Sequence, residues 1–152
     1  MDPDVLNLVL DRQVEPADLV PAILSGFKRV TSPGVVYPCL VEQEASKLSG
    51  LALASPSPRD VVRLTWFEDG EYDLVATYVV LADGSEVEAW LFKAIDAVLS
   101  PDRTPWCPLA WSRSSKLTYL EECPDWMIGC PDPEWPHSVA PQAFVRTILQ
   151  PA

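Results

Sequence analysis

Two strand-like segments joined by a short turn restrict the fold of this chain more than any other feature. EYDLVATYVVL, residues 71–81, and SEVEAWLFKA, residues 85–94, are rich in the Val, Tyr, Trp and Phe residues that favour strands. Asp83 and Gly84 lie between them, and Asp-Gly is typical of tight hairpin turns in which both central residues have positive φ. The sequence therefore predicts an antiparallel hairpin over residues 71–94.

The segments before the hairpin predict two helices with strands between them. Residues 2–10 begin with Asp-Pro and residues 57–68 begin with Ser-Pro-Arg-Asp, which are favourable helix starts. Strand-like runs, punctuated by Gly and Pro, occupy residues 22–30, 35–41 and 46–54. Because strands and helices do not alternate regularly, we predict an α+β fold with a mixed or antiparallel sheet that can close into a barrel.

The composition changes after residue 100. Half of the sixteen prolines and four of the six tryptophans lie in SPDRTPWCPLAW and CPDWMIGCPDPEWPHSVAPQ. We expect residues 1–100 to form the core and residues 101–152 to form a helical and looped extension packed on it, with helices near 112–122 and 140–150. The four tryptophans form either a satellite core of the extension or a lid over a ligand; they are Trp106, Trp111, Trp126 and Trp135.

The charge and the absence of targeting segments limit the expected partners. The net charge is −11 and no run of Lys and Arg could follow a phosphate backbone, so we expect a small-molecule ligand rather than nucleic acid or an anionic membrane. No apolar run approaches the roughly 20 residues that cross a bilayer, and the N-terminal segment lacks the features of a signal peptide. A cytoplasmic location is predicted, and the oligomeric state is left open.

The sequence contains no motif for a metal or a nucleotide cofactor. The four cysteines include no C-x-x-C pair, so no zinc site is predicted; they are Cys39, Cys107, Cys123 and Cys130. No G-x-G-x-x-G segment and no P-loop are present. We therefore expect a protein that works without a cofactor.

Five short segments occur in a distinctive order within roughly residues 1–93. They read LSGFKR (24–29), YPCLV (37–41), LSGLAL (48–53), VVRLTWFEDGEY (61–72), and a hairpin that runs from DG into AWLF (83–92). Their order and spacing resemble the gamma-glutamylcyclotransferase-like family, including its avirulence-induced-gene branch. The resemblance implies a small closed barrel of mixed strands with flanking helices.

The chain departs from the family pattern at two points. Family members usually begin with a strand and tight loop reading roughly YGTL, whose backbone N–H groups bind the γ-glutamyl part of the substrate, whereas this sequence begins MDPDVL. A barrel without that strand is expected to have an exposed edge that favours self-association or a partner. Asp73-Leu74 stands where the family usually has an Arg two residues after the Tyr.

The resemblance also implies a reaction. In the family, the α-amine of a γ-glutamyl amine, amide or peptide attacks its own γ-carbonyl, and 5-oxoproline and an amine are released. Such an acyltransferase or lyase needs a group that moves a proton from the attacking nitrogen to the departing one. Matching the family motif places Glu68 in that catalytic role, as a carboxyl whose pKa is raised by burial beside Trp66 and Phe67.

Each candidate residue has a second interpretation. Glu68 could instead be a solvated turn residue together with Asp69 and Glu71. Tyr37 and Tyr72 are expected either to bind the substrate in the glutamyl pocket or to be core aromatics whose hydroxyls reach the surface. The alternatives for the whole protein are a non-catalytic binding or interaction module and a pathway enzyme that reuses the pocket on another amide.

Overall fold

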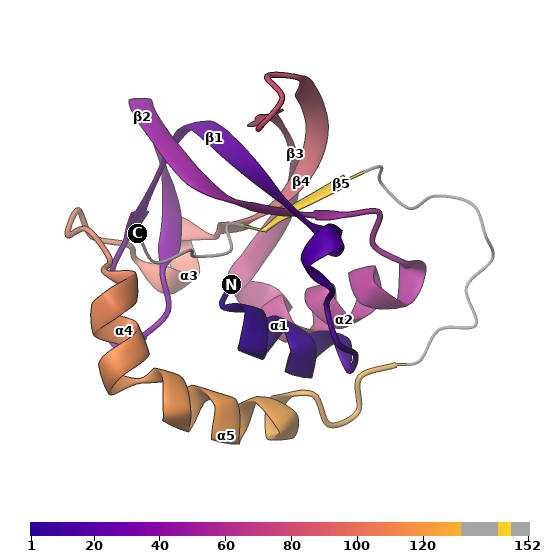
Figure 1. Ribbon diagram of the computed structural model, residues 1–152. Helices are drawn as coiled ribbons and strands as arrows, with labels where there is room; N and C mark the ends of the chain where they lie inside the picture. Colours follow the sequence, from indigo (N-terminus) through magenta and orange to yellow (C-terminus); the bar gives the residue numbers. More distant parts are fainter. Residues whose placement is uncertain (132–142, 147–152) are drawn as a thin grey trace.

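The computed structural model describes residues 1–131 and 143–146, and the strands in this part of the chain follow one another around a closed barrel. They are β1 (Leu19–Val30), β2 (Cys39–Ala54), β3 (Tyr72–Leu81), β4 (Glu86–Ala94) and β5 (Ala143–Arg146), in the order β1-β2-β5-β4-β3. All neighbouring pairs are antiparallel except β4 and β5. The predicted α+β fold with a small mixed barrel is confirmed (Figure 1).

The short strand β5 bridges the gap between β2 and β4. It forms three residue pairs with β2 and one with β4, so this seam is narrow compared with the ladders that join β1 to β2 and β3 to β4. The sequence predicted a helix over residues 140–150, and this is wrong for Ala143–Arg146. An extended segment is favoured here because it pairs with the backbone groups that β2 and β4 present at their edges.

The strand β2 contains the end of the segment predicted over residues 35–41 and all of the segment predicted over residues 46–54, which the sequence predicted as separate strands. Its register with β1 shifts between Ser25 and Phe27, on either side of Gly26, which has a φ of 82°. Ser25 pairs with Lys47, whereas Phe27 pairs with Glu42. This irregularity changes which side chains of β1 face the barrel interior from that point onward.

The predicted hairpin is confirmed as β3 and β4, but its turn differs from the expected one. Gly84 has a φ of 84°, whereas Asp83 is not among the residues with positive φ. Instead, Oδ1 of Asp83 accepts hydrogen bonds from the backbone N–H and the hydroxyl of Ser85, at 2.9 and 2.6 Å. The turn is a three-residue loop with glycine in the left-handed position.

The helices lie outside the strands. They are α1 (Pro3–Leu10), α2 (Pro58–Glu68), α3 (Asp96–Leu99), α4 (Pro108–Ser114) and α5 (Lys116–Trp126), with 3-10 turns η1 (Pro16–Asp18) and η2 (Asp69–Glu71). The first two helices confirm the predictions over residues 2–10 and 57–68, and their N-cap side chains accept backbone hydrogen bonds. The helix predicted over 112–122 corresponds to parts of α4 and α5, because the chain leaves helical dihedral angles at Ser115.

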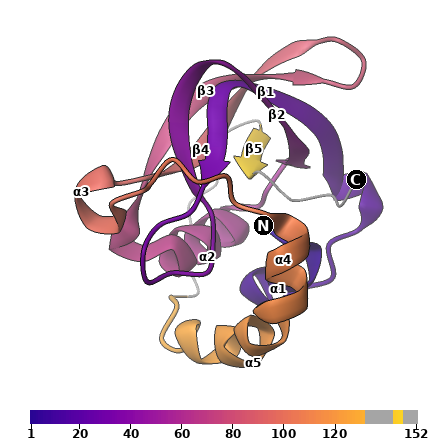
Figure 2. The ribbon, with the colours of Figure 1, turned by 90° about the vertical axis from the view of Figure 1, so that its left-hand side faces the viewer.

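The helices α1, α2 and α5 gather below one end of the barrel (Figures 1 and 2). There α1 contacts both α2 and α5. The apolar faces of these helices and the ends of β2 and β4 form one core cluster, which includes Leu6, Val9, Leu64, Leu53, Phe92, Trp111 and Cys123. A second cluster fills the barrel interior with small and medium residues, namely Ala22, Leu24, Leu40, Ala52, Val79, Ala89 and Leu91. The alanines suit a barrel of so few strands because its interior is narrow.

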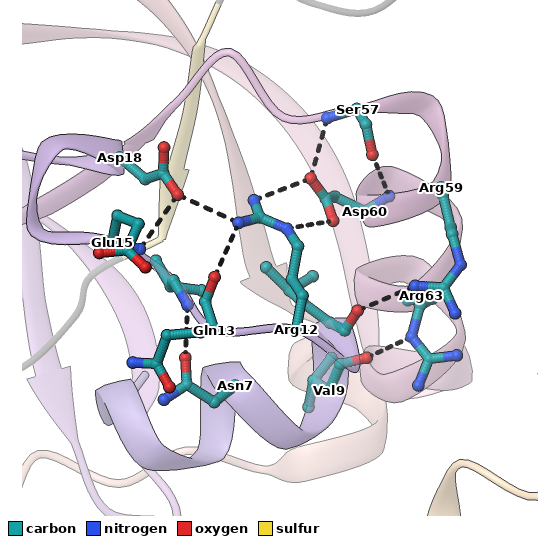
Figure 3. Close-up of polar contacts among 12 residues, drawn as sticks. Asn7, Val9, Arg12, Gln13, Glu15, Asp18, Ser57, Arg59, Asp60 and Arg63 are labelled. Carbon is teal, nitrogen blue, oxygen red and sulfur yellow. Dashed lines mark hydrogen bonds and ion pairs between the residues drawn. The ribbon is translucent and has the colours of Figure 1, made fainter.

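A polar network fixes the start of α2 to the segment that follows α1 (Figure 3). The guanidinium of Arg12 donates from Nε and Nη2 to the two carboxylate oxygens of Asp60, at 3.1 and 3.0 Å, and from Nη1 to Asp18 at 3.0 Å. Asp60 also caps its own helix, since it exchanges hydrogen bonds with Ser57. Farther along α2, Nε of Arg63 donates to the carbonyl of Val9. These contacts fix the direction of α2 and thus the position of its last residue.

Candidate active site

A cavity of about 1120 Å³ lies where the end of α2 meets β1, β4 and the helices α4 and α5. Aromatic and aliphatic side chains form most of its wall. Glu68, Tyr37 and Tyr72, the residues predicted from the sequence as a site, all line this one cavity. Because they come from α2, the segment before β2 and the start of β3, only the folded chain brings them together.

Glu68 is the last residue of α2, and only 9% of its surface is exposed. This exposure does not agree with the interpretation of Glu68 as a solvated turn residue. The helix ends there because the next residue, Asp69, has a φ of 47° and a ψ of −154°. A residue other than glycine adopts such a conformation only at a cost of about 1–3 kcal/mol. The turn η2 then leads directly into β3, so Glu68 is held between two regular elements.

Tyr37 and Tyr72 form one edge of the cavity, with ring centroids 6.5 Å apart. The hydroxyl of Tyr37 donates a 2.6 Å hydrogen bond to Oε2 of Glu71, so a second carboxylate is fixed near the site. Burial, assisted by that hydrogen bond, raises the pKa of Tyr37, and burial also raises the pKa of Tyr72. Both tyrosines therefore remain neutral hydroxyl groups at ordinary pH. They also pack against the hydrophobic core, as the second interpretation expected, so each tyrosine belongs both to the core and to the cavity lining.

The wall opposite the barrel is built around Tyr119 of α5. Its ring centroid lies 4.7 Å from that of Trp126, 5.7 Å from that of Trp111 and 6.4 Å from those of Phe67 and Tyr37. The segment after residue 100 therefore supplies part of the cavity wall as well as part of the core. Trp111 illustrates both functions because it is buried and also lines the cavity. Trp135 lies outside the described residues.

Arg29 is the only Lys or Arg among the described residues that line the cavity. It lies on β1 beyond the irregularity at Gly26 and pairs with Leu40, a residue of the barrel interior. Its Nη2 donates to the carbonyl of Ser49 at 2.9 Å. Burial lowers the pKa of Arg29 to about 10, so the side chain is still charged at neutral pH.

Sequence reasoning missed Arg29 because of the irregularity in β1. Ala22 and Leu24 face the barrel interior, and a regular two-residue period would continue through residues 26, 28 and 30. The shift at Gly26 instead turns Phe27 and Arg29 inward. The glycine itself was the available signal, since an isolated glycine within a strand pattern often marks a bulge.

Within residues 1–131 and 143–146, no group of three or more His, Cys, Asp or Glu side chains is arranged to hold a metal ion. In the same part of the chain, no helix combines the length and the apolar character needed to span a membrane.

The fold and the cavity define a small barrel protein with a buried carboxyl at the end of a helix and an aromatic wall around it. Residues 1–109 match the sequence profile of the family described as gamma-glutamyl cyclotransferase, AIG2-like. The chain belongs to this family, as its motif order indicated.

Curated relatives come from Arabidopsis thaliana. AIG2-like protein A is 34% identical over 126 residues, which are 79% of this chain and 72% of that protein. Protein AIG2 C is 34% identical over 86 residues, which are 57% of this chain and 50% of that protein. For the second relative, the match thus spans about half of its length.

Two solution structures of Arabidopsis thaliana proteins have a similar fold. One has a TM-score of 0.59 and 20% identity, with 92% of this chain and 89% of that chain covered. The other has a TM-score of 0.57 and 29% identity, with 88% of each chain covered. The architecture described here, including its helices, is therefore similar to that of these solved structures.

Proposed function

We propose that this protein is a γ-glutamyl cyclotransferase that converts a γ-glutamyl amine, amide or peptide into 5-oxoproline and a free amine. The observation that carries the proposal is the position of Glu68, a carboxyl with 9% exposure that lines a largely apolar cavity together with Tyr37 and Tyr72. Membership of the cyclotransferase-like family supports the reaction type.

The proposed reaction needs one proton carrier. The α-ammonium of the substrate first releases one proton to solvent. The resulting neutral α-amine attacks the γ-carbonyl carbon, and a new C–N bond closes the five-membered ring. The carboxylate of Glu68 accepts a proton from the attacking nitrogen and returns it to the departing nitrogen as the old C–N bond breaks. The products are 5-oxoproline and the amine, and Glu68 is again a carboxylate.

The surroundings of Glu68 suit this role. Burial makes a carboxylate accept a proton more readily than it would in open water, because the charged form loses solvation. Since nucleophile and electrophile belong to one molecule, the protein accelerates the reaction mainly by holding the glutamyl chain in a folded conformation. The cavity is large enough for that chain and for an amine of considerable size.

The test is the release of 5-oxoproline from a panel of γ-glutamyl amines, amides and dipeptides. Wild-type protein should release 5-oxoproline from at least one compound, and Glu68→Gln should lower kcat by about 100-fold or more. Glu88→Gln, an exposed change on β4, is the matched control and should keep full activity. Circular dichroism and the melting temperature should show that both variants are folded. No release from any compound, or equal activity of Glu68→Gln, would refute the proposal.

A binding module without catalysis is the second candidate. The names of the curated relatives state no activity, and a cavity with an aromatic wall can hold a ligand without transforming it. This candidate predicts that wild-type protein binds a γ-glutamyl compound and releases it unchanged after long incubation. Mass spectrometry of the recovered compound separates the two functions. The predicted cytoplasmic location suits either function, and cell fractionation tests it.

A further inference from the structure

We infer that Arg29 binds a carboxylate of the ligand and that this cation restricts the cavity to substrates that carry such a group. Within the proposed function, on which this assignment rests, the group is the α-carboxylate of the γ-glutamyl moiety. Arg29 is thereby a substrate-binding residue that acts alongside Glu68.

The first observation is an unsatisfied donor. Nε of Arg29 is buried and has no hydrogen-bond partner among the described residues. Buried N–H groups without a partner are rare because they lose their interaction with water and gain nothing in return. A guanidinium presents its donors in a fixed planar fork that matches the two oxygens of a carboxylate. A ligand carboxylate is therefore a suitable partner for this nitrogen.

The second observation is the charge environment of Arg29. Two arginines that hold a fixed position in the fold are neutralised by carboxylates, Arg12 by Asp18 and Asp60 and Arg59 by Asp11. Arg29 forms no ion pair within the described residues, although the chain is strongly acidic. A partly buried positive charge without a counter-ion is costly, and a bound anion removes that cost.

The third observation is that the backbone around Arg29 is held firmly. Its carbonyl accepts a hydrogen bond from the N–H of Trp106, and its residue pair with Leu40 lies within the long ladder between β1 and β2. Nη2 is already fixed on the carbonyl of Ser49. Because Nη2 is held in this way, the guanidinium of Arg29 loses little conformational entropy when its other nitrogens bind a ligand.

The arrangement of the cavity follows from these contacts. The other charged side chains that line it are acidic, namely Asp2, Glu68, Asp69 and Glu71. A γ-glutamyl compound carries a negative α-carboxylate and a positive α-ammonium on the same carbon. Arg29 attracts the first group and the carboxylates attract the second, so the two signs fix the orientation of the substrate.

Isothermal titration of the full chain with two small probes tests the inference without turnover. The probes are 5-oxoproline, which keeps the α-carboxylate, and 2-pyrrolidinone, the same ring without it. Wild-type protein should bind 5-oxoproline about 10- to 100-fold more tightly than 2-pyrrolidinone, as expected for loss of a charged hydrogen-bonded pair. Equal affinities, or no binding of 5-oxoproline, would overturn the inference.

Variants locate the effect at Arg29. Arg29→Met should lose the preference for 5-oxoproline, and Arg29→Lys should recover part of it because the charge returns without the planar fork. Lys47→Met, which removes an exposed charge on β2, is the matched control and should bind like wild type. If Arg29→Met retains the preference, the inference is wrong. If Arg29→Met does not fold, the comparison of the two probes on wild-type protein still decides.

The outcome is separable from that of the proposed function. Arg29-dependent binding of 5-oxoproline by a protein that releases none from any γ-glutamyl compound would support the carboxylate site and refute the cyclotransferase. If wild-type protein turns over a γ-glutamyl compound and Arg29→Met has the same KM as wild type, the cyclotransferase would be supported and the carboxylate site refuted. If both proposals hold, Arg29→Met should raise KM more than it lowers kcat, whereas Glu68→Gln should lower kcat.

Discussion

The phenolic oxygen of Tyr37 lies 2.6 Å from Oε2 of Glu71, and this hydrogen bond links the segment before β2 to the turn that follows Glu68. The N–H of Ile95, after β4, also donates to the carbonyl of Glu71. The turn η2 is thus held from two sides, although it contains only three residues. The edge of the cavity at Glu68 depends on contacts between segments that are far apart in the sequence.

Tyr37→Phe should lower the free energy of unfolding by about 1 kcal/mol, because it removes one hydrogen bond to a carboxylate and leaves the ring in place. Chemical denaturation measures the change. Tyr78→Phe, at a tyrosine with 61% exposure, is the control and should have no measurable effect. Equal stability of Tyr37→Phe and wild type would show that the bond does not contribute.

Asp60→Asn should lower the free energy of unfolding by about 3 kcal/mol. The side chain of Asp60 is 3% exposed and binds both Arg12 and the helix start at Ser57, so the variant removes the more buried of the two charge partners of a partly buried guanidinium. Asp18→Asn removes the more exposed partner of the same arginine and should cost less than about 1 kcal/mol. Similar costs for the two variants would contradict the importance assigned to the buried contact.

The stability of wild-type protein should depend on pH through Asp60. Burial raises the pKa of Asp60, but the hydrogen bonds from Arg12 and Ser57 outweigh this and hold the pKa below its usual value. A carboxyl with a lowered folded pKa contributes stability above its unfolded pKa of about 3.9, and the contribution is lost as pH falls through the folded pKa.

Urea denaturation between about pH 3 and pH 7 measures this dependence. The difference in free energy of unfolding between wild type and Asp60→Asn should be constant above about pH 5 and should shrink as the pH falls below about 4. A difference that does not change with pH would mean that Asp60 keeps its ordinary pKa in the folded protein.

Asp69→Gly should raise the free energy of unfolding by about 1 kcal/mol. Glycine adopts the φ of 47° and ψ of −154° at this position without steric cost, and this gain exceeds the added flexibility of the unfolded chain. The matched control is Asp83→Gly, where aspartate also precedes a glycine but has no positive φ and binds Ser85. The control should be neutral or destabilising, and a gain in both variants would refute the explanation by strain. The melting temperature reports both.

Local signals predicted a large part of the fold, and the family resemblance predicted three residues of the candidate site. The helix over residues 57–68 and the hairpin over residues 71–94 follow from short sequence features, a capping box and a turn with glycine. Glu68 was predicted from the family motif, which places it at the junction of these two elements. Tyr37 and Tyr72 followed from the family motifs, and the structure brings all three to one cavity.

The sequence by itself determined the positions of α1, α2 and the β3–β4 hairpin, because capping and turn chemistry act over a few residues. The tertiary structure alone decided that Ala143–Arg146 is a strand, that Arg29 faces the cavity and that Tyr119 lies against Tyr37. Each of these depends on pairing or packing between segments tens of residues apart. The free energy of such contacts is set by the whole fold, and no local pattern encodes it.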